Sequence, residues 1–192
     1  MVFIFFFFYF VFQSSFMKNN IIWFGICFLI FATLKYLFRC MDVDYIRFLI
    51  FPTSIILEIV TGAKAVYEDG AGYFYSDLNI IIDKSCSGFN FLLISFLMTA
   101  FIFLRQTFTK KWIVIPLSFA IAYLITIIAN VSRITGYLAI MRGSLPQLLD
   151  ANDSWLHQAE GVFVYLFFLI LLYFILNHIT NIRNSNEETA QS

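Results

Sequence analysis

The chain contains several apolar runs that are each long enough to cross a lipid bilayer. A transmembrane helix needs roughly 20 apolar residues, and 61% of the 192 residues here are hydrophobic, with 26 phenylalanines. Only 12% are charged, which is about half the share of a soluble domain. Because a helix satisfies its own backbone polar groups inside lipid, the sequence predicts an all-α, polytopic membrane protein.

We predict about six transmembrane spans in a single membrane domain. They cover approximately residues 1–17, 20–38, 45–61, 88–104, 112–130 and 157–177. The first lacks a basic n-region and a small-residue cleavage site, so it is expected to be a retained span rather than a signal peptide. The third carries Pro52 and Glu58, which predict a kink and a partly buried carboxylate. The polar tail, 178–192, is predicted to be disordered.

The longest polar stretch, 62–87, lies between the third and fourth spans. Its aromatic run at 73–75 and its apolar run at 78–82 flank a Ser-Asp turn, and this pattern predicts a short hairpin outside the cytoplasm. A later apolar segment, 134–141, is too short to cross the bilayer. We therefore expect this segment to lie along the membrane surface.

The lysines and arginines near the spans predict the orientation of the chain. In a six-span topology one side carries Lys35, Arg39, Arg47, Arg105, Lys110, Lys111 and Arg183. The other side carries the smaller set Lys18, Lys64, Lys84, Arg133 and Arg142. The first side is therefore expected to be cytoplasmic, with both termini inside.

Cys86 stands just before the fourth span, in the segment Asp-Lys-Ser-Cys-Ser-Gly-Phe-Asn that covers 83–90. Ser85 or Ser87 can accept a hydrogen bond from the first free N–H groups of a helix that starts here. Those N–H groups and the helix dipole favour an anion, and the thiolate is the nucleophilic form of cysteine. Taken alone, Cys86 is more simply explained as one of three apolar thiols in a membrane protein.

The predicted topology places two other reactive residue types at the depth of Cys86. Arg133 falls at the outer end of the fifth span and His157 at the outer start of the sixth. A thiolate attacks a carbonyl, a histidine transfers protons, and an arginine stabilises charge on the oxygen. An interfacial arginine is usually a snorkelling anchor, and a lone histidine is usually structural. However, three reactive residue types at one face of the membrane favour a functional site. Asn130 could position Arg133, and Glu160 could oppose or orient the histidine.

Three short motifs together resemble the signature boxes of the exosortase/archaeosortase family. They are Cys86, Ser87 and Gly88; Asn130-Val-Ser-Arg133 followed by Ile134; and His157-Gln-Ala-Glu-Gly161. Their order, spacing and placement at span ends match the family. The short chain is most similar to the exosortase K subgroup. The likeness covers roughly residues 52–172, and the first two spans carry no signature of it.

The resemblance implies a cysteine protease and transpeptidase without a cofactor at the outer face of a bacterial cytoplasmic membrane. Its partners would be membrane lipids and substrate proteins that end in a short motif, a transmembrane helix and a basic tail. By the same resemblance Cys86 is the nucleophile, Arg133 the oxyanion or carbonyl partner, and His157 the general acid and base. The chain is shorter than typical members, and the Asp-Lys-Ser before Cys86 is more polar than the expected Glu-Ala.

Two other interpretations remain open at this point. A transporter subunit would need ionisable residues near the bilayer midplane, and only Glu58 comes near it. A non-catalytic factor for surface export would tolerate loss of Cys86. Nucleic-acid binding is not indicated, because no basic stripe is present. The three cysteines, Cys27, Cys40 and Cys86, form no disulfide framework, and no Cys/His cluster indicates a metal.

Overall fold

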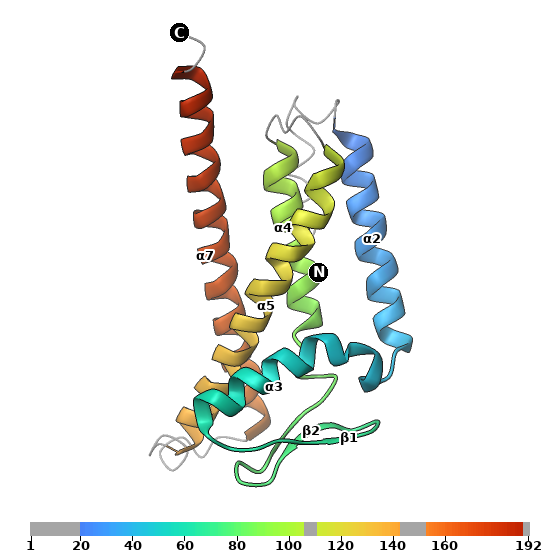
Figure 1. Cartoon of the computed structure of the whole chain (residues 1–192), viewed down its shortest axis with the longest axis vertical. Helices are drawn as coiled ribbons and strands as arrows, with labels where there is room; N and C mark the ends of the chain where they lie inside the picture. Colours follow the sequence, from blue (N-terminus) through green and yellow to red (C-terminus); the bar gives the residue numbers. More distant parts are fainter. Residues whose placement is uncertain (1–19, 106–110, 143–152, 190–192) are drawn as a thin grey trace.

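The computed structural model describes residues 20–105, 111–142 and 153–189. Four of its helices run along the length of the molecule (Figure 1). These are α2 (Ile21–Cys40), α4 (Phe89–Arg105), α5 (Lys111–Arg142) and α7 (Asp153–Thr189). By length and composition α2, α5 and α7 can each cross a membrane, and α4 is a shorter apolar helix of 17 residues. The first predicted span, 1–17, lies outside the described residues.

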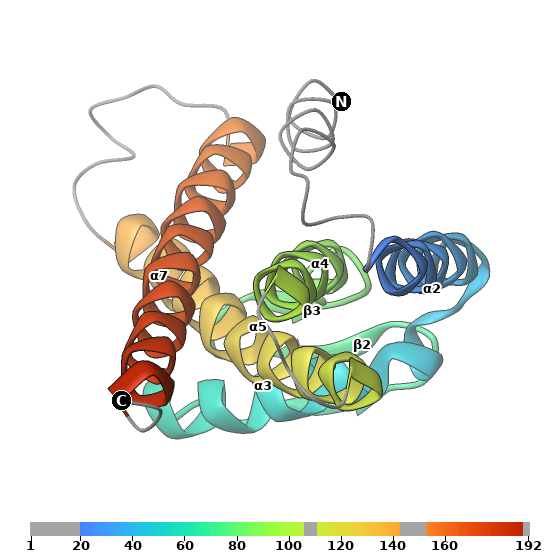
Figure 2. The ribbon, with the colours of Figure 1, turned by 90° about the horizontal axis from the view of Figure 1, so that it is seen from above.

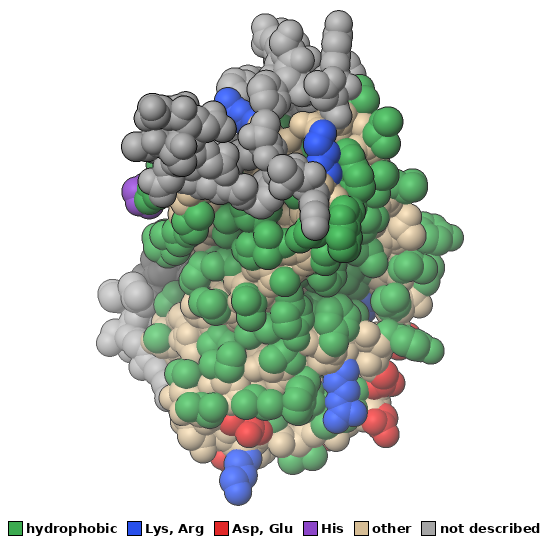
Figure 3. Space-filling model, turned by 45° about the horizontal axis from the view of Figure 1, so that its top comes forward, with side chains coloured by type: hydrophobic (Ala, Val, Ile, Leu, Met, Phe, Trp, Pro, Cys, Tyr) green, Lys and Arg blue, Asp and Glu red, His purple; other side chains and the backbone are tan. Residues whose placement is uncertain are grey.

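Helix α4 forms the centre of the bundle, and it packs against α2, α5 and α7. Its side chains Leu92, Leu93 and Phe96 are fully buried in the main core. In contrast, α2 and α7 point large apolar side chains outward, such as Ile22 at 73% and Phe163 at 72% exposed. Figure 3 shows a broad apolar band with charged groups gathered toward its ends. An apolar outer surface of this extent fits a lipid environment, so the chain is a multi-pass membrane protein.

Helix α3 (Arg47–Thr61) lies across one end of the bundle, after the 3₁₀ turn η2 (Val43–Ile46) (Figures 1 and 2). It has 15 residues, which is about 22 Å at 1.5 Å per residue, short of the roughly 30 Å hydrocarbon core. The prediction of a lengthwise third span at 45–61 therefore does not match the structure. Pro52 stays inside α3, and Tyr123 supplies the donor that a proline lacks, because its hydroxyl bonds the Phe48 carbonyl at 2.7 Å.

Since α3 runs across the bundle, α2 points the opposite way from the six-span prediction. The side-chain amide of Asn20 donates to the Leu104 carbonyl at 2.8 Å, and Lys111 binds the Asn20 side chain. The start of α2 thus lies beside the end of α4. At the other end of α2, Lys84 donates to the Met41 carbonyl. Residues 39–41 and the segment before α4 therefore share one end of the bundle.

This arrangement changes which basic residues lie at each end of the bundle. Lys35 binds Asn90 in the first turn of α4, and the Arg39 carbonyl accepts from Lys84. Arg47 donates to the Tyr73 hydroxyl at 3.4 Å. Lys35, Arg39 and Arg47 lie at the Cys86 end of the bundle and not at the Arg105 end. The number of basic residues at each end therefore no longer favours the Arg105 end as the cytoplasmic one.

A three-stranded antiparallel sheet connects α3 to α4. Its strands are β1 (Val66–Glu68), β2 (Gly72–Tyr75) and β3 (Ile80–Ile82), in the order β1-β2-β3. The β2–β3 hairpin was predicted, and it pairs Tyr73 with Ile82; strand β1, with three residues, was not. The buried Tyr75 hydroxyl lies 2.9 Å from the Ser54 hydroxyl and donates to the Ser54 carbonyl, which fixes the sheet to α3.

The last two helices are longer than the sequence indicated. The segment 134–141, expected on the membrane surface, forms the final turns of α5, and residues 178–189 continue α7 instead of a disordered tail. The polar residues Asn130 and Arg133 indicated the end of a span. They are 0% and 8% exposed, because they face neighbouring helices, so the helix passes through them.

Candidate functional site

Cys86 lies on a tight turn between β3 and α4. Asp83 organises this turn, because its Oδ1 atom accepts the N–H of Ser85 at 2.9 Å and the N–H of Cys86 at 3.1 Å. The Ser85 hydroxyl donates to the same oxygen at 2.6 Å and lies 3.8 Å from the cysteine sulfur. Helix α4 begins at Phe89, so Cys86 lies just before the helix, where the sequence placed it. The thiol is half-buried.

Ser87 and Gly88 shape the entry into α4. The Ser87 hydroxyl donates to the Lys84 carbonyl at 2.8 Å and accepts the Phe89 N–H at 3.4 Å, so the predicted capping role of Ser87 is confirmed. Gly88 has φ +72°, and a Cβ at this position would lie 3.1 Å from the Thr126 Cγ2 atom. Glycine therefore supplies both the left-handed backbone and the room for α5 to approach.

Asn130 connects α5 to the turn formed by residues 83–88, called the cysteine turn below. Its side-chain amide donates to the Cys86 carbonyl at 2.6 Å, and its Oδ1 atom accepts from the Tyr165 hydroxyl of α7 at 3.0 Å. Asn130 is fully buried. The sequence suggested that Asn130 positions Arg133, whereas the structure shows it holding the turn that carries Cys86. Three segments that are distant in sequence meet at this one side chain.

Arg133 follows Asn130 by one turn of α5 and lies against α7. Its guanidinium carbon is 5.4 Å from the centre of the Tyr165 ring, a distance typical of a cation–π contact. A Cβ at Gly161 would lie 3.3 Å from the Arg133 Cδ atom, so the glycine leaves room for the side chain to run along α7. Among the described residues, the buried Nε and Nη2 atoms have no hydrogen-bond partner. Such donors favour a bound anion or a polarised carbonyl oxygen.

Glu160 lies on the same side of α7, close to Arg133. The carboxylate interacts electrostatically with Arg133, and both of its buried oxygens lack a hydrogen-bond partner among the described residues. A Cβ at Gly136 would lie 2.9 Å from the Glu160 Oε1 atom. Glycines on both helices therefore allow the buried carboxylate and the buried guanidinium to reach the α5–α7 interface.

His157 falls in the second turn of α7, four residues before Gly161. Its side chain lies outside the described residues, so its convergence with Cys86 and Arg133 stays a prediction. Tyr165 is a residue that the sequence did not identify. It is one of ten tyrosines in a chain that is 20% aromatic, and its spacing of four residues from Gly161 is the signal that could have found it.

The other polar candidates have structural explanations. The Glu58 carboxylate accepts the Ala65 N–H at 2.9 Å and so closes the loop after α3. Cys27 is buried in the bundle core and Cys40 is exposed at the end of α2. No group of three or more potential metal-ligating side chains occurs in the described part of the chain.

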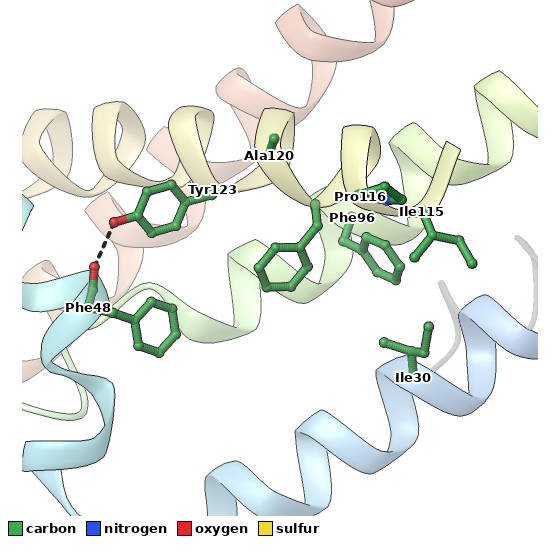
Figure 4. Close-up of a pocket in the computed structure, with 8 residues that line it drawn as sticks. Ile30, Phe48, Phe96, Ile115, Pro116, Ala120 and Tyr123 are labelled. Atoms are coloured by element: carbon green, nitrogen blue, oxygen red, sulfur yellow. Dashed lines mark hydrogen bonds between the residues drawn. The ribbon is translucent and has the colours of Figure 1, made fainter. Parts of the chain in front are cut away.

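An open apolar groove with a volume of about 530 Å³ lies among α2, α3, α4 and α5 (Figure 4). It is lined by Ile30, Phe48, Phe96, Ile115, Pro116, Phe119, Ala120 and Tyr123. None of these lining residues is a candidate site residue, so the groove contributes no group to the candidate site.

Comparison with known families places these residues in context. A family model described as Transmembrane exosortase (Exosortase_EpsH) matches residues 1–174. The match starts well before residue 52, where the resemblance was expected to begin, and it includes Cys86, Arg133 and His157. No curated protein and no solved structure matches the chain. The match covers most of the 192 residues, and the chain therefore belongs to the transmembrane exosortase family.

Proposed function

We propose that this protein is a membrane-embedded cysteine protease and transpeptidase that cleaves and sorts proteins with a C-terminal sorting signal. Membership in the exosortase family implies protein-sorting transpeptidation in general terms. One contact carries the proposal further. Asn130 holds the Cys86 carbonyl, 44 residues away, while Arg133 offers buried N–H donors one turn along the same helix. A candidate nucleophile and a candidate oxyanion partner are thus fixed by a single helix.

The proposed reaction begins with transfer of the Cys86 thiol proton to His157. The thiolate then attacks the carbonyl carbon of the scissile peptide bond, and Arg133 donates hydrogen bonds to the oxyanion. The C–N bond breaks as His157 returns its proton to the departing amine, which leaves a thioester on Cys86. An acceptor amine or water attacks the thioester, loses a proton to His157 and releases the cysteine.

The helical repeat of α7 supports the role of His157. Residues 157, 161 and 165 are spaced by four, so they lie along one side of the helix. Gly161 and Tyr165 both meet Arg133 of α5 on that side. Glu160 follows His157 by three residues and lies beside Arg133, so it is a candidate to orient either partner. In this proposal Ser87 and Gly88 shape the cysteine turn and do not react.

We infer that the Cys86 end faces the outside of a bacterial cytoplasmic membrane. Arg105, Lys110 and Lys111 lie in or beside the short connection between α4 and α5, and such clusters are typical of cytoplasmic loops. The C-terminal end of α7 lies at this same end of the bundle (Figure 1). The substrates would present a short motif at the outer face, held by a transmembrane helix and a basic tail.

Interception of the acyl-enzyme tests this mechanism. Membranes that contain the protein and a co-expressed candidate substrate with such a C-terminal region would be treated with hydroxylamine, a small nucleophile that cleaves thioesters. We expect the processed substrate to carry a C-terminal hydroxamate, detected by mass spectrometry, and Cys86→Ala to produce none. Processing that continues at the normal rate without any hydroxamate would contradict a thioester intermediate.

A further inference from the structure

Tyr165, on α7, contacts two residues of the proposed site, Asn130 and Arg133 of α5. Its hydroxyl donates to Asn130 Oδ1 at 3.0 Å, and its ring lies beneath the Arg133 guanidinium. The hydroxyl would also be 3.4 Å from a Cβ at Gly88. Tyr165 therefore contacts Asn130, which holds the Cys86 carbonyl, and the Arg133 side chain, and it lies beside the glycine that precedes α4.

The hydrogen bond from Tyr165 fixes which way the Asn130 amide points. A backbone carbonyl can only accept, so Asn130 must turn its NH₂ group toward Cys86. Its Oδ1 atom then faces Tyr165, whose hydroxyl donates to it. Without this hydroxyl, Oδ1 would be buried without a donor, and a buried acceptor left unpaired is costly. The tyrosine hydroxyl thereby stabilises the amide orientation that the cysteine turn requires.

The ring of Tyr165 is itself held in place. Phe91 of α4 stacks on it, with 4.7 Å between the ring centres and an interplanar angle of 21°. Arg133 is 5.4 Å from the centre of the same ring. Because one rigid ring carries both the hydroxyl and the surface beneath the guanidinium, a shift of Tyr165 would move Asn130 and Arg133 together.

We propose that Tyr165 is a positioning residue that sets the Cys86 turn through its hydroxyl and the Arg133 guanidinium through its ring. This inference rests on the proposed function for its effect on catalysis, but the coupling of Tyr165 to the cysteine turn is independent of any activity. Helix α7 would then contribute two residues to the site, His157 and, two turns further along the helix, Tyr165.

Hydrogen exchange of the purified full-length protein in detergent micelles tests the coupling directly. In the peptide that covers 83–92, the N–H groups of Cys86, Ser87 and Phe89 are hydrogen-bonded within the turn. Loss of one neutral hydrogen bond should open this turn about fivefold more often. We therefore expect Tyr165→Phe to accelerate exchange in this peptide about fivefold and to leave peptides from α2 unchanged.

Matched variants separate positioning from general stability. Tyr173→Phe removes a hydroxyl from the same helix, at a side chain that is 46% exposed, and should leave the exchange of 83–92 unchanged. Asn130→Leu should accelerate that exchange as Tyr165→Phe does. The double variant should be no faster than Asn130→Leu, since both changes break one linked pair of hydrogen bonds. Unchanged exchange in Tyr165→Phe, or additive effects in the double variant, would overturn the inference.

The catalytic consequence is a separate measurement. In the processing assay Tyr165→Phe should lower kcat about fivefold with an unchanged KM, because Tyr165 touches no substrate in this proposal. Tyr165→Leu also removes the ring and should lower kcat further. An increase in KM alone would contradict the positioning role. A failure of the hydroxylamine experiment would instead refute the proposed function, whatever the exchange of the turn shows.

Discussion

The side-chain amide of Asn130 donates a 2.6 Å hydrogen bond to the backbone carbonyl of Cys86. This bond joins the middle of α5 to the turn before α4, and it is fully buried on the asparagine side. The N–H of Cys86 is held by Asp83. Both backbone polar groups of the cysteine are therefore fixed, which leaves its thiol to be presented by a rigid turn.

Substitution of Gly88 should damage this turn more than an equally strained glycine elsewhere. Gly88 and Gly62 have nearly the same φ, +72° and +73°, but a Cβ meets α5 only at Gly88. Gly62→Ala should cost about 1–2 kcal/mol from the left-handed backbone alone. Gly88→Ala should cost about 1 kcal/mol more through overpacking and should also reduce processing. Thermal unfolding and processing of both variants check this, and equal losses in the two would contradict it.

Arg133→Lys should lower processing roughly a hundredfold although it keeps the positive charge. An ammonium lacks the planar fork that donates two parallel hydrogen bonds, and loss of one oxyanion donor costs on the order of 3 kcal/mol. Arg39→Lys, at an exposed position near the end of α2, is the matched control and should process normally. Near-normal processing by Arg133→Lys at equal membrane levels would remove the arginine from the oxyanion role.

The apolar runs predicted the positions of α2, α4, α5 and α7, and the turn dipeptide predicted the β2–β3 hairpin. The motif residues Cys86, Asn130 and Arg133 were also recognised as candidates, since reactive side chains at the ends of apolar runs are conspicuous. Periodicity and composition carry this information because they report which segments must be removed from water.

Tertiary contacts decided what the sequence could not predict. Asn130 and Arg133 indicated a helix end, but neighbouring helices bury both residues, so α5 continues. Helix α3 is as apolar as a span, yet its buried face rests on the sheet and α5, and it lies across the bundle. Tyr165 resembles the other aromatic residues of α7 in sequence, and its role depends on a hydrogen bond to a side chain 35 residues away.

The reversed direction of α2 gives a topological prediction. Cys40 and Cys86 should be accessible from the same side of the membrane, because Lys84 joins the two segments through the Met41 carbonyl. Variants that retain only Cys40 or only Cys86 would be treated in intact cells with a membrane-impermeant maleimide. We expect both to be labelled without permeabilisation. Labelling of Cys86 alone would restore the six-span topology and contradict the position of α3.

The contact between Tyr67 and Asp44 should be visible in a pH titration. The Tyr67 hydrogen bond lowers the pKa of Asp44, and the same bond raises the pKa of Tyr67 to about 12. The bond needs an ionised aspartate and a neutral tyrosine. Its stabilisation is therefore lost as the pH falls through the lowered Asp44 pKa, and at the alkaline end as the pH rises through about 12.

Tyrosinate absorbance measures the titration of the Tyr67 hydroxyl at alkaline pH. The difference between the unaltered protein and Tyr67→Phe should show one phenol that titrates near 12. In an Asp44→Asn background this phenol should titrate closer to the ordinary tyrosine value of about 10. Asp77→Asn, at another exposed aspartate of the same region, is the control. A Tyr67 titration that does not respond to Asp44→Asn would contradict the contact.

Processing by Cys86→Ala tests the central claim most directly. The variant would be expressed with a candidate substrate, at membrane levels matched to the unaltered protein by immunoblot, beside the controls Cys27→Ala and Cys40→Ser. We expect both controls to process the substrate normally and Cys86→Ala to process none, because water cannot replace a positioned thiolate in forming the acyl-enzyme. Normal processing by Cys86→Ala at matched levels would contradict the account.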